Sequence, residues 1–399
     1  MDVQAARIAT SPRGLALLES LPPYATIDPL SLGEQLRAQG AHPDVVSVAL
    51  TQARLRSEGE AKFGPFAKGM VFTPAGLEQA TRLVVAARHA SRYRDAGIGR
   101  VADLTTGIGA DAMAFAALGI GVLAFEKDEA TALIADHNLR HWEDARVVHA
   151  DSLATLASGA VDVDGVFADP ARRTARGRRH DPRDYEPPLD EVLALRGRWS
   201  ALGVKVGPGI PHDALPASAA QAPVEAQWVS VDGDVVEAGI WCGPLARHPG
   251  RTALVIRGDQ AHLLTGSTEQ APTGELAERL LEPDGAVIRS GLIGELADRL
   301  GARLVDPAIA YLTTDAPVAT PFASAFRIEE ALPYSEKALA GALRARGIGS
   351  VEIKKRGMDI APEQLRRRLR LRGDDAATVI LTRVAGKRMA LIARREESG

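Results

Sequence analysis

The pattern of apolar positions divides the chain into four stretches of different character. Residues 1–95 carry apolar residues at helical spacing, interrupted by prolines, which predicts a helical N-terminal region. From residue 96 to 265, short apolar runs typical of strands alternate with helical stretches. Residues 266–325 read as a connecting region with one helix, and residues 326–397 return to a regular order of strands and helices, which predicts a small α+β domain.

The alternating stretch predicts an α/β fold with a parallel, doubly wound Rossmann-like sheet. Its strands are expected at 101–104, 121–125, 146–149, 165–168 and 204–206, with helices at 110–118, 129–140 and 188–199. Residues 225–264 predict antiparallel pairs that complete the edge of the sheet. Because ligands of such sheets bind at the carboxyl ends of the strands, functional side chains are expected there.

A glycine-rich turn follows the first predicted strand, with the sequence DLTTGIG at residues 103–109. Gly107 and Gly109 allow a sharp turn and a close approach of the backbone to a ligand. The start of the following helix offers unpaired N–H groups to polar or anionic atoms. Together with Ala112 the glycines also match the dinucleotide-binding pattern, so they do not by themselves select a cofactor.

Acidic residues follow the next three strands and are expected to face one crevice. Glu126 ends the second strand, Asp151 the third and Asp169 the fourth. A carboxylate after the second strand can accept hydrogen bonds from both hydroxyls of a ribose. One after the third strand can accept a hydrogen bond from an adenine amino group. Alternatively, Glu126 is a solvated strand end, and Asp151, which precedes Ser152, caps a helix.

Composition narrows the classes of protein that fit. With 46% hydrophobic and 25% charged residues, the 399-residue chain is expected to be globular with more than one domain. It has no run of about 18 apolar residues, and its first residues lack a secretory signal, so a cytoplasmic location is expected. Cys242 is the only cysteine, and the nine histidines are scattered, so neither a disulfide nor a metal site is expected.

Charge is distributed unevenly along the sequence. Residues 327–399 contain 17 Lys+Arg against 10 Asp+Glu, a balance of +7, which leaves −10 for the rest of the chain. A basic module on an acidic body suggests a polyanionic partner. The alternative is a solvated helix face in an arginine-rich chain.

The motifs at the strand ends, in this order and spacing, resemble the S-adenosylmethionine (SAM) site of class I methyltransferases over about residues 95 to 245. The resemblance implies that SAM is the cofactor. It implies that Gly107 and Gly109 lie along the methionine part of SAM and that Asp103 positions the methionine ammonium. It also implies that Glu126 holds the ribose and that Asp151 approaches the adenine. The full set of expected cofactor-binding residues is Asp103, Thr105, Gly107, Gly109, Glu126, Asp151 and Ser152.

The same resemblance places Asp169 where methyl donor and acceptor meet, as the expected catalytic residue. The motif here is Asp-Pro-Ala-Arg, which lacks the aromatic residue that stacks on the base in methyltransferases of exocyclic amines. It resembles a segment of some RNA uracil-C5 methyltransferases, but the place of their cysteine reads Lys205-Val206-Gly207, so covalent C5 chemistry is not supported. Cys242 is expected to be a small core residue.

Two basic segments are expected to contact substrate. Six arginines lie within residues 172–183, on a loop that is expected at the rim of the crevice. These arginines either bind phosphates of the substrate or belong to a solvated loop. Residues 326–397 resemble the THUMP-like domain found behind some bacterial methyltransferase domains, and THUMP domains proper bind RNA. Expected substrate-binding residues are Pro170, Arg172, Arg173, Lys354, Lys355 and Arg356.

The sequence therefore predicts a SAM-dependent methyltransferase that acts on structured RNA, such as tRNA or rRNA, positioned by the basic C-terminal domain. Few aromatic residues are available there to stack on bases, so shape and phosphate recognition is expected. The alternatives are a non-catalytic SAM- or RNA-binding protein and an NAD-dependent oxidoreductase. The latter leaves Asp103 and Asp169 without a role.

Overall fold

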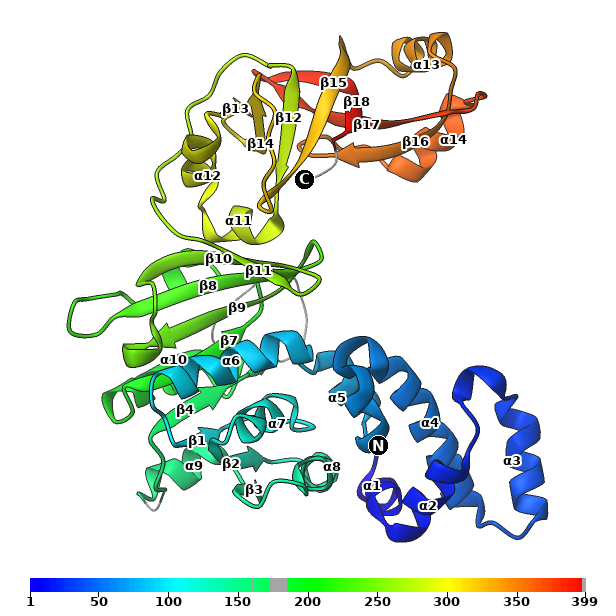
Figure 1. Ribbon diagram of the computed structural model, residues 1–399, viewed down its shortest axis with the longest axis vertical. Helices are drawn as coiled ribbons and strands as arrows, with labels where there is room; N and C mark the ends of the chain where they lie inside the picture. Colours follow the sequence, from blue (N-terminus) through cyan, green and yellow to red (C-terminus); the bar gives the residue numbers. More distant parts are fainter. Residues whose placement is uncertain (160, 173–184, 397–399) are drawn as a thin grey trace. The chain divides into compact units, whose positions relative to one another are not determined.

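The computed structural model describes residues 1–159, 161–172 and 185–396, which fold as two compact units. The first unit comprises residues 1–206, 211–224 and 240–247, and the second comprises residues 207–210, 225–239 and the chain from 248 onward. Figure 1 labels their helices and strands. Within the described ranges, no helix combines the length and the apolar character needed to cross a membrane.

The N-terminal region is helical, as its pattern predicts. Capping side chains start several of its helices: Ser11 accepts a hydrogen bond from the Gly14 N–H, and Thr73 accepts one from the Gly76 N–H. Its elements are α1 (Val3–Thr10), α2 (Pro12–Ser20), η1 (Tyr24–Thr26), α3 (Pro29–Ala38), α4 (Pro43–Phe63), η2 (Gly64–Gly69), α5 (Pro74–Gln79) and α6 (Leu83–Asp95). These helices belong to the first compact unit, because α1 packs on α8 (Glu129–Leu139) and α6 packs on α7 (Ala110–Ala117) (Figure 1).

The predicted doubly wound sheet is confirmed. Its parallel strands lie in the order β3-β2-β1-β4-β7, within a nine-stranded sheet. They are β1 (Arg100–Asp103), β2 (Gly121–Glu126), β3 (Ala145–His149), β4 (Gly165–Ala168) and β7 (Ala201–Val206), connected partly by α9 (Ser152–Ala157), α10 (Leu189–Ala194) and η4 (Leu195–Gly197). The chain order reverses between β1 and β4, and such a switch point opens a crevice at the strand ends.

Four more strands complete this sheet in the order β11-β10-β8-β9-β7. They are β8 (Val224–Val231), β9 (Asp234–Cys242), β10 (Gly250–Arg257) and β11 (Gln260–Leu264), with η5 (His212–Ala214) and η6 (Gly243–Leu245) in the connections. The antiparallel pairing of β10 with β11 follows the sequence pattern, whereas the parallel pairing of β8 with β10 joins two predicted hairpins and has no local signal. A short two-stranded sheet, β5 (Ala171–Arg172) and β6 (Tyr185–Glu186), lies outside it.

The second unit contains a seven-stranded sheet with the order β13-β14-β12-β15-β18-β17-β16. Its elements are β12 (Arg279–Pro283), α11 (Gly285–Ser290), α12 (Ile293–Leu300), β13 (Arg303–Asp306), β14 (Ile309–Thr314), β15 (Ala323–Pro333), α13 (Glu336–Ala345), β16 (Ile348–Lys355), α14 (Pro362–Leu369), β17 (Asp375–Val384) and β18 (Lys387–Arg395). The last six are the strands and helices of the predicted small α+β domain. The stretch read as a connecting region instead supplies three strands to the same sheet, through antiparallel pairing of β12 with β15.

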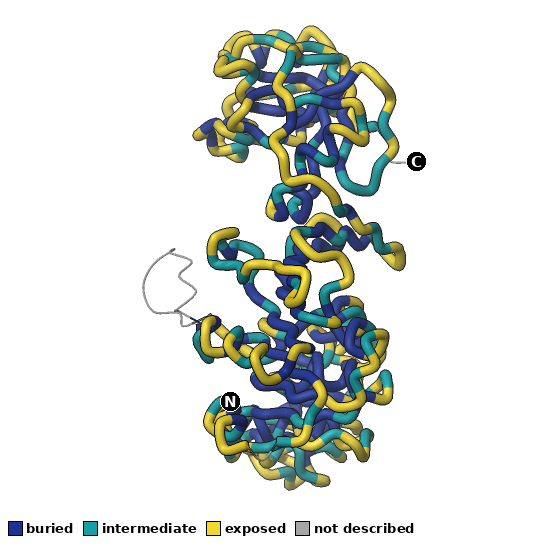
Figure 2. Tube along the Cα trace, turned by 90° about the vertical axis from the view of Figure 1, so that its left-hand side faces the viewer, coloured by how far each residue is buried: buried dark blue, intermediate teal, exposed yellow. Residues whose placement is uncertain are grey.

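The core of the first unit is built on tight packing around the central strands, where buried positions concentrate (Figure 2). The Tyr93 hydroxyl of α6 donates to the Val166 carbonyl of β4 at 2.6 Å, and the fully buried Tyr93 ring meets Phe115 edge-on at 4.9 Å. A Cβ added to Gly203 of β7 would lie 2.6 Å from both the Tyr93 hydroxyl and the Trp241 ring. Gly203 therefore lets an aromatic layer lie against the sheet.

We predict that Gly203→Ala lowers the free energy of unfolding by about 1 to 3 kcal/mol, because the added methyl group overpacks this layer. Urea denaturation of the purified variant, followed by circular dichroism, measures the change. Gly197→Ala is the matched control, since a Cβ there meets no atom within 4 Å, and it should change stability by less than about 0.5 kcal/mol. Equal stability of the two variants would contradict the packing argument.

Candidate active site

A cavity of about 470 Å³ lies in the first unit, at the carboxyl ends of the parallel strands. Three parts of the chain line it: the segment of residues 73–81 that contains α5, the strand ends with the glycine-rich turn, and the segment of residues 186–191 before and within α10. The sequence predicted the second part. The other two carry no motif, and only the fold brings them to the strand ends.

The glycine-rich turn lies between β1 and α7 as predicted. Gly107 and Gly109 have φ values of 55° and 90°, the left-handed region that favours glycine. Gly107 lines the cavity with Thr105 and Ile108, whereas Gly109 is the N-cap of α7 and is not among the lining residues. The turn is tied to the neighbouring strand, because the Gly107 N–H donates to the Glu126 carboxylate at 3.1 Å.

Asp103 at the end of β1 lines the cavity and is almost fully buried, with 1% of its surface exposed. Its carboxylate accepts from the Thr106 hydroxyl at 2.7 Å and from the Thr105 N–H at 3.3 Å. Burial raises the pKa of Asp103 to about 7, and the nearby charges of Asp111 and Asp169 also raise it. At neutral pH this carboxyl group is therefore poised between its neutral and ionised forms.

Glu126 at the end of β2 lines the same cavity and keeps hydrogen-bonding capacity. Its carboxylate accepts from the N–H groups of Gly107 and Asp128, at 3.1 and 2.9 Å. Burial raises the pKa of Glu126, and these two backbone donors act in the opposite direction. Since a carboxylate offers about four lone-pair sites, Glu126 can still accept a hydrogen bond from a ligand.

Asp151 and Ser152, after β3, also line the cavity. The Asp151 carboxylate accepts from the Ala154 N–H at 2.9 Å, which makes it the N-cap of α9. Ser152 is buried with 7% of its surface exposed. The helix-cap alternative for Asp151 is thus realised, and its position in the wall leaves the second oxygen available to a ligand.

Asp169, after β4, lines the cavity and forms an ion pair with Lys205 at the end of β7. Its backbone N–H donates to the Thr105 hydroxyl at 2.7 Å, so the glycine-rich turn and the acidic motif are joined directly. Pro170 is buried and is not among the lining residues. In the sequence motifs Lys205 marks only the place of a missing cysteine, but its position at a strand end is a signal for a site residue.

The remaining expected substrate residues either are not among the residues that line this cavity or fall outside the described ranges. Arg172 belongs to β5, and Arg173 and the rest of the arginine-rich loop lie outside the described residues. In the second unit, the Lys354 ammonium pairs with Glu282 at 2.7 Å, the Arg356 guanidinium lies over the Tyr311 ring at 5.2 Å, and Lys355 is exposed. Cys242 is buried, and burial raises the pKa of its thiol to about 11, as fits a core residue.

We call residues 70–81, which run from the end of η2 through α5 to α6, the strap. Buried polar side chains hold it in place: Gln52 bonds both the N–H and the C=O of Phe72, and Asn138 of α8 does the same for Val71. Asn138 also donates to the Ile108 carbonyl at 2.8 Å, which links the strap to the glycine-rich turn. The strap is therefore a fixed wall of the cavity.

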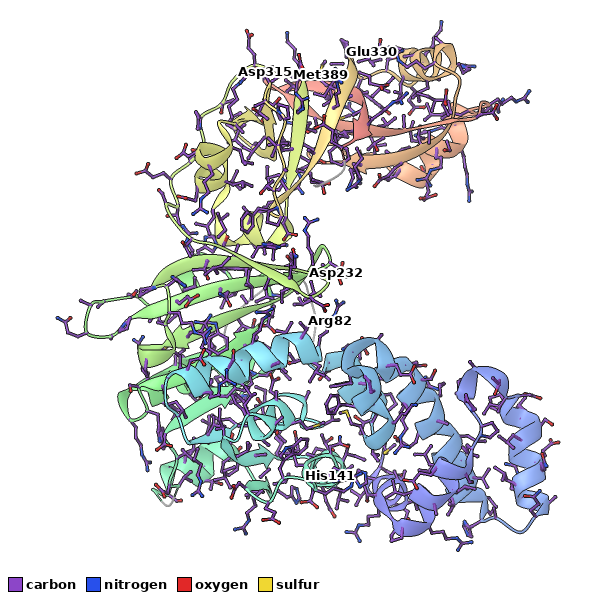
Figure 3. All side chains as sticks on the ribbon, in the orientation of Figure 1. Arg82, His141, Asp232, Asp315, Glu330 and Met389 are labelled. Carbon is purple, nitrogen blue, oxygen red and sulfur yellow. The ribbon has the colours of Figure 1, made fainter. Side chains whose placement is uncertain are left out.

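The Lys62 ammonium binds the strap where α5 ends. It donates to the carbonyls of Leu77, Glu78 and Ala80, at 2.8, 2.5 and 3.0 Å, where α5 ends. These carbonyls have no partner within the helix, and a cation there also favours the helix dipole. Burial lowers the pKa of Lys62, and the charges of Lys205 and Arg82 lower it further; Figure 3 shows Arg82 where α6 begins.

Comparison with known proteins identifies the family. An uncharacterized S-adenosylmethionine-dependent methyltransferase of Mycobacterium tuberculosis is 33% identical over 316 residues, which cover 79% of this chain and 85% of the relative. The chain belongs to the S-adenosylmethionine-dependent methyltransferases. SAM is therefore the methyl donor of this methyltransferase, and the NAD-dependent alternative is excluded.

Two family models and one solved structure add to this result. The model of a THUMP domain-like family matches residues 323–395 of the methyltransferase, and a domain of unknown function (DUF8688) matches residues 2–58. The crystal structure of a protein described as a putative methyltransferase from Porphyromonas gingivalis W83 is similar with a TM-score of 0.73 and 22% identity, over 96% of this chain and 98% of that one. This likeness confirms the fold.

The residues present in the cavity fit SAM. The adenosine part of SAM offers hydroxyl and amino donors, which the carboxylates of Glu126 and Asp151 can accept. Its amino-acid part carries an ammonium group, and Asp103 and Asp111 offer carboxylates in the same wall. The methyltransferase thus presents acceptors for both ends of the molecule.

We predict that Lys62→Met loosens the strap of the methyltransferase. Without the ammonium, the carbonyls at the end of α5 lose three charge-assisted hydrogen bonds, so the amide protons of Leu77 and Ala80 should exchange about tenfold faster, which corresponds to about 1.4 kcal/mol. Hydrogen exchange followed by mass spectrometry measures this. Lys68→Met, at an exposed position, is the control. Unchanged protection of residues 74–81 would show that Lys62 does not hold the strap.

Proposed function

We propose that this methyltransferase transfers the methyl group of SAM to structured RNA, with the THUMP-like C-terminal domain as the RNA-binding module. The observation that carries the proposal is the match of residues 323–395 to the THUMP domain-like family. It coincides with the basic stretch of residues 327–399, which carries 17 Lys+Arg against 10 Asp+Glu. A basic module with this family resemblance fits a polyanion better than a neutral small molecule.

The distribution of charges on the C-terminal domain supports phosphate contacts by a particular group of arginines. Arg346, the C-cap of α13, pairs with Glu330 of β15 at 2.7 Å (Figure 3 labels Glu330), and Arg368 pairs with Glu336 at 3.1 Å. By contrast, the exposed side chains of Arg367, Arg370 and Arg372 at the end of α14 form no ion pair among the described residues. Their guanidinium groups are suited to phosphate oxygens.

Base stacking is a poor fit for this domain. The Tyr334 ring is covered by the Arg388 guanidinium at 5.3 Å, and the Tyr311 ring is buried beneath Arg356. Since single-stranded RNA is recognised mainly by stacking on exposed aromatic rings, these positions favour recognition of a folded RNA by its shape and backbone.

In the cavity, each end of SAM has a proposed set of residues. Glu126 accepts hydrogen bonds from the ribose hydroxyls, through lone pairs that the backbone amides leave free. Asp151 and Ser152 face the adenine. Thr105, Gly107 and Gly109 shape the turn along the methionine part, and Asp103 faces its ammonium. The hydrogen bond from Gly107 to Glu126 supports this arrangement, because it fixes the turn relative to the ribose site.

Asp169 is the proposed catalytic residue, because its carboxylate lines the cavity at the switch point of the sheet. It would accept a hydrogen bond from the acceptor group and take its proton as the methyl group is transferred. Its backbone is fixed by Thr105 and its carboxylate by Lys205, so the acceptor would be aligned with little loss of entropy in the transition state.

We predict that Asp169→Ala lowers methyl transfer to RNA by at least about 100-fold and leaves S-adenosylhomocysteine binding unchanged, because Asp169 is proposed to contact the acceptor and not the cofactor. The assay follows tritium from labelled SAM into tRNA and rRNA purified from cells that lack this protein. Asp162→Ala is the control, since that carboxylate precedes β4 and is fully exposed. Full turnover by Asp169→Ala would refute the catalytic role, and label in small molecules but not in RNA would refute the RNA acceptor.

We predict that S-adenosylhomocysteine affinity rises with pH up to about 7 and then levels off. Burial raises the pKa of Asp103 to about 7, so below that pH the group is neutral and must release a proton to pair with the ligand ammonium. The dependence should reach at most about tenfold per pH unit. Calorimetric titrations between pH 5.5 and 7.5 measure it. Asp103→Asn should flatten the profile, and an unchanged slope in that variant would assign the titration to another group.

A further inference from the structure

One buried carboxylate in the cavity wall has no part in the sequence motifs. Asp111 is the second residue of α7, has 7% of its surface exposed and lines the cavity together with Asp103 and Asp169. A carboxylate so buried must be compensated by hydrogen bonds or by charge, since burial of an unpaired ion is very unfavourable. The partners of Asp111 therefore indicate what it is built to do.

Two side chains from the N-terminal helical region fix both oxygens of this carboxylate. The Thr81 hydroxyl, between α5 and α6, donates to Oδ2 at 2.6 Å, and His89 Nδ1 of α6 lies 2.8 Å from Oδ1. The His89 ring is itself held by the rings of Phe167 and Trp241, at 5.5 and 5.2 Å. The plane of the carboxylate is thus defined from two sides, and each oxygen keeps a lone pair for another donor.

The two acids of this wall differ in charge at neutral pH. Burial alone would raise the pKa of Asp111, but the hydrogen bond and charge of His89, with Lys205 and Thr81, lower it below its ordinary value. Burial raises the pKa of Asp103 to about 7. The contacts of Asp111 therefore favour its ionised form, whereas Asp103 is ionised only in part at neutral pH.

The strap encloses this side of the glycine-rich turn. A Cβ added to Gly76 of α5 would lie 2.3 Å from the Ile108 side chain, so α5 rests directly on the turn. The Thr81 bond to Asp111 then joins the end of the strap to the helix that the turn begins. A cation bound in this part of the cavity is shielded from water and requires a fixed anionic partner.

We propose that Asp111 is a cofactor-positioning residue that binds the α-ammonium group of SAM, with its carboxylate oriented by Thr81 and His89. The inference rests on the proposed placement of the cofactor along the glycine-rich turn. It assigns a function to the contact between the N-terminal helices and α7. The helices orient the Asp111 carboxylate, and this carboxylate orients the amino-acid end of the methyl donor.

The test compares two ligands that differ in one group: S-adenosylhomocysteine and its deamino analogue, in which hydrogen replaces the α-amino group. Asp111→Asn should weaken binding of S-adenosylhomocysteine by about 10- to 100-fold, the loss expected for a hydrogen bond to a charged group. Binding of the deamino analogue should change by less than about threefold, because it has no ammonium to lose. Calorimetry measures both affinities without need of an acceptor.

Equal weakening of both ligands by Asp111→Asn would overturn the proposal, because a residue that only supports the fold does not distinguish them. Thr81→Val is the second variant. It keeps the charge and removes one orienting bond, so it should weaken S-adenosylhomocysteine by about three- to tenfold and spare the deamino analogue. If Asp111→Asn does not fold, the same comparison with Thr81→Val decides, and an equal effect on both ligands overturns the proposal.

Glu126→Gln separates this inference from the placement on which it rests. Because Glu126 is proposed to face the ribose, that variant should weaken both ligands equally. If it weakens neither while Asp111→Asn discriminates between them, the ribose assignment fails and the ammonium assignment stands. If Glu126→Gln weakens both and Asp111→Asn weakens neither, the placement stands and Asp111 has no part in it.

Discussion

A carboxylate removed from water must be neutral or be held by hydrogen bonds and opposite charge, and the active site is organised by this requirement. Each acid meets it differently. Burial raises the pKa of Asp103 to about 7. The contacts of His89 and Thr81 favour the ionised form of Asp111, and Asp169 is paired with Lys205. Acids of the same type, brought to one cavity by parallel strands and the helix after β1, thereby acquire different chemical properties.

The requirement also explains why the N-terminal helices belong to the same unit as the sheet. The partners that ionise Asp111 come from residues 81 and 89, and the strap is held by Gln52 and Lys62. These helices therefore supply both one wall of the cavity and the side chains that bond Asp111. The helical region is thus part of the site itself.

The sequence predicts the features that depend on local patterns. Strand ends mark Glu126 and Asp169 as site residues, Asp151 is found as a helix cap as in one of its two interpretations, and the last part of the chain forms the predicted strands and helices. It does not predict Thr81 or His89 as partners of Asp111, because they lie 30 and 22 residues away and each reads as an ordinary helical position. The pairing of β12 with β15 escapes prediction for the same reason, since non-local strand pairing leaves no local pattern.

The charges of the two functional parts constrain any RNA acceptor. Of the described residues that line the cavity, seven are Asp or Glu and one is Lys, whereas the C-terminal domain carries exposed arginines. For the proposed RNA acceptor, this distribution would favour an uncharged part of a nucleotide, such as a base, in the cavity and phosphates at the arginines. A bound cationic methyl donor would offset part of the negative charge of these carboxylates.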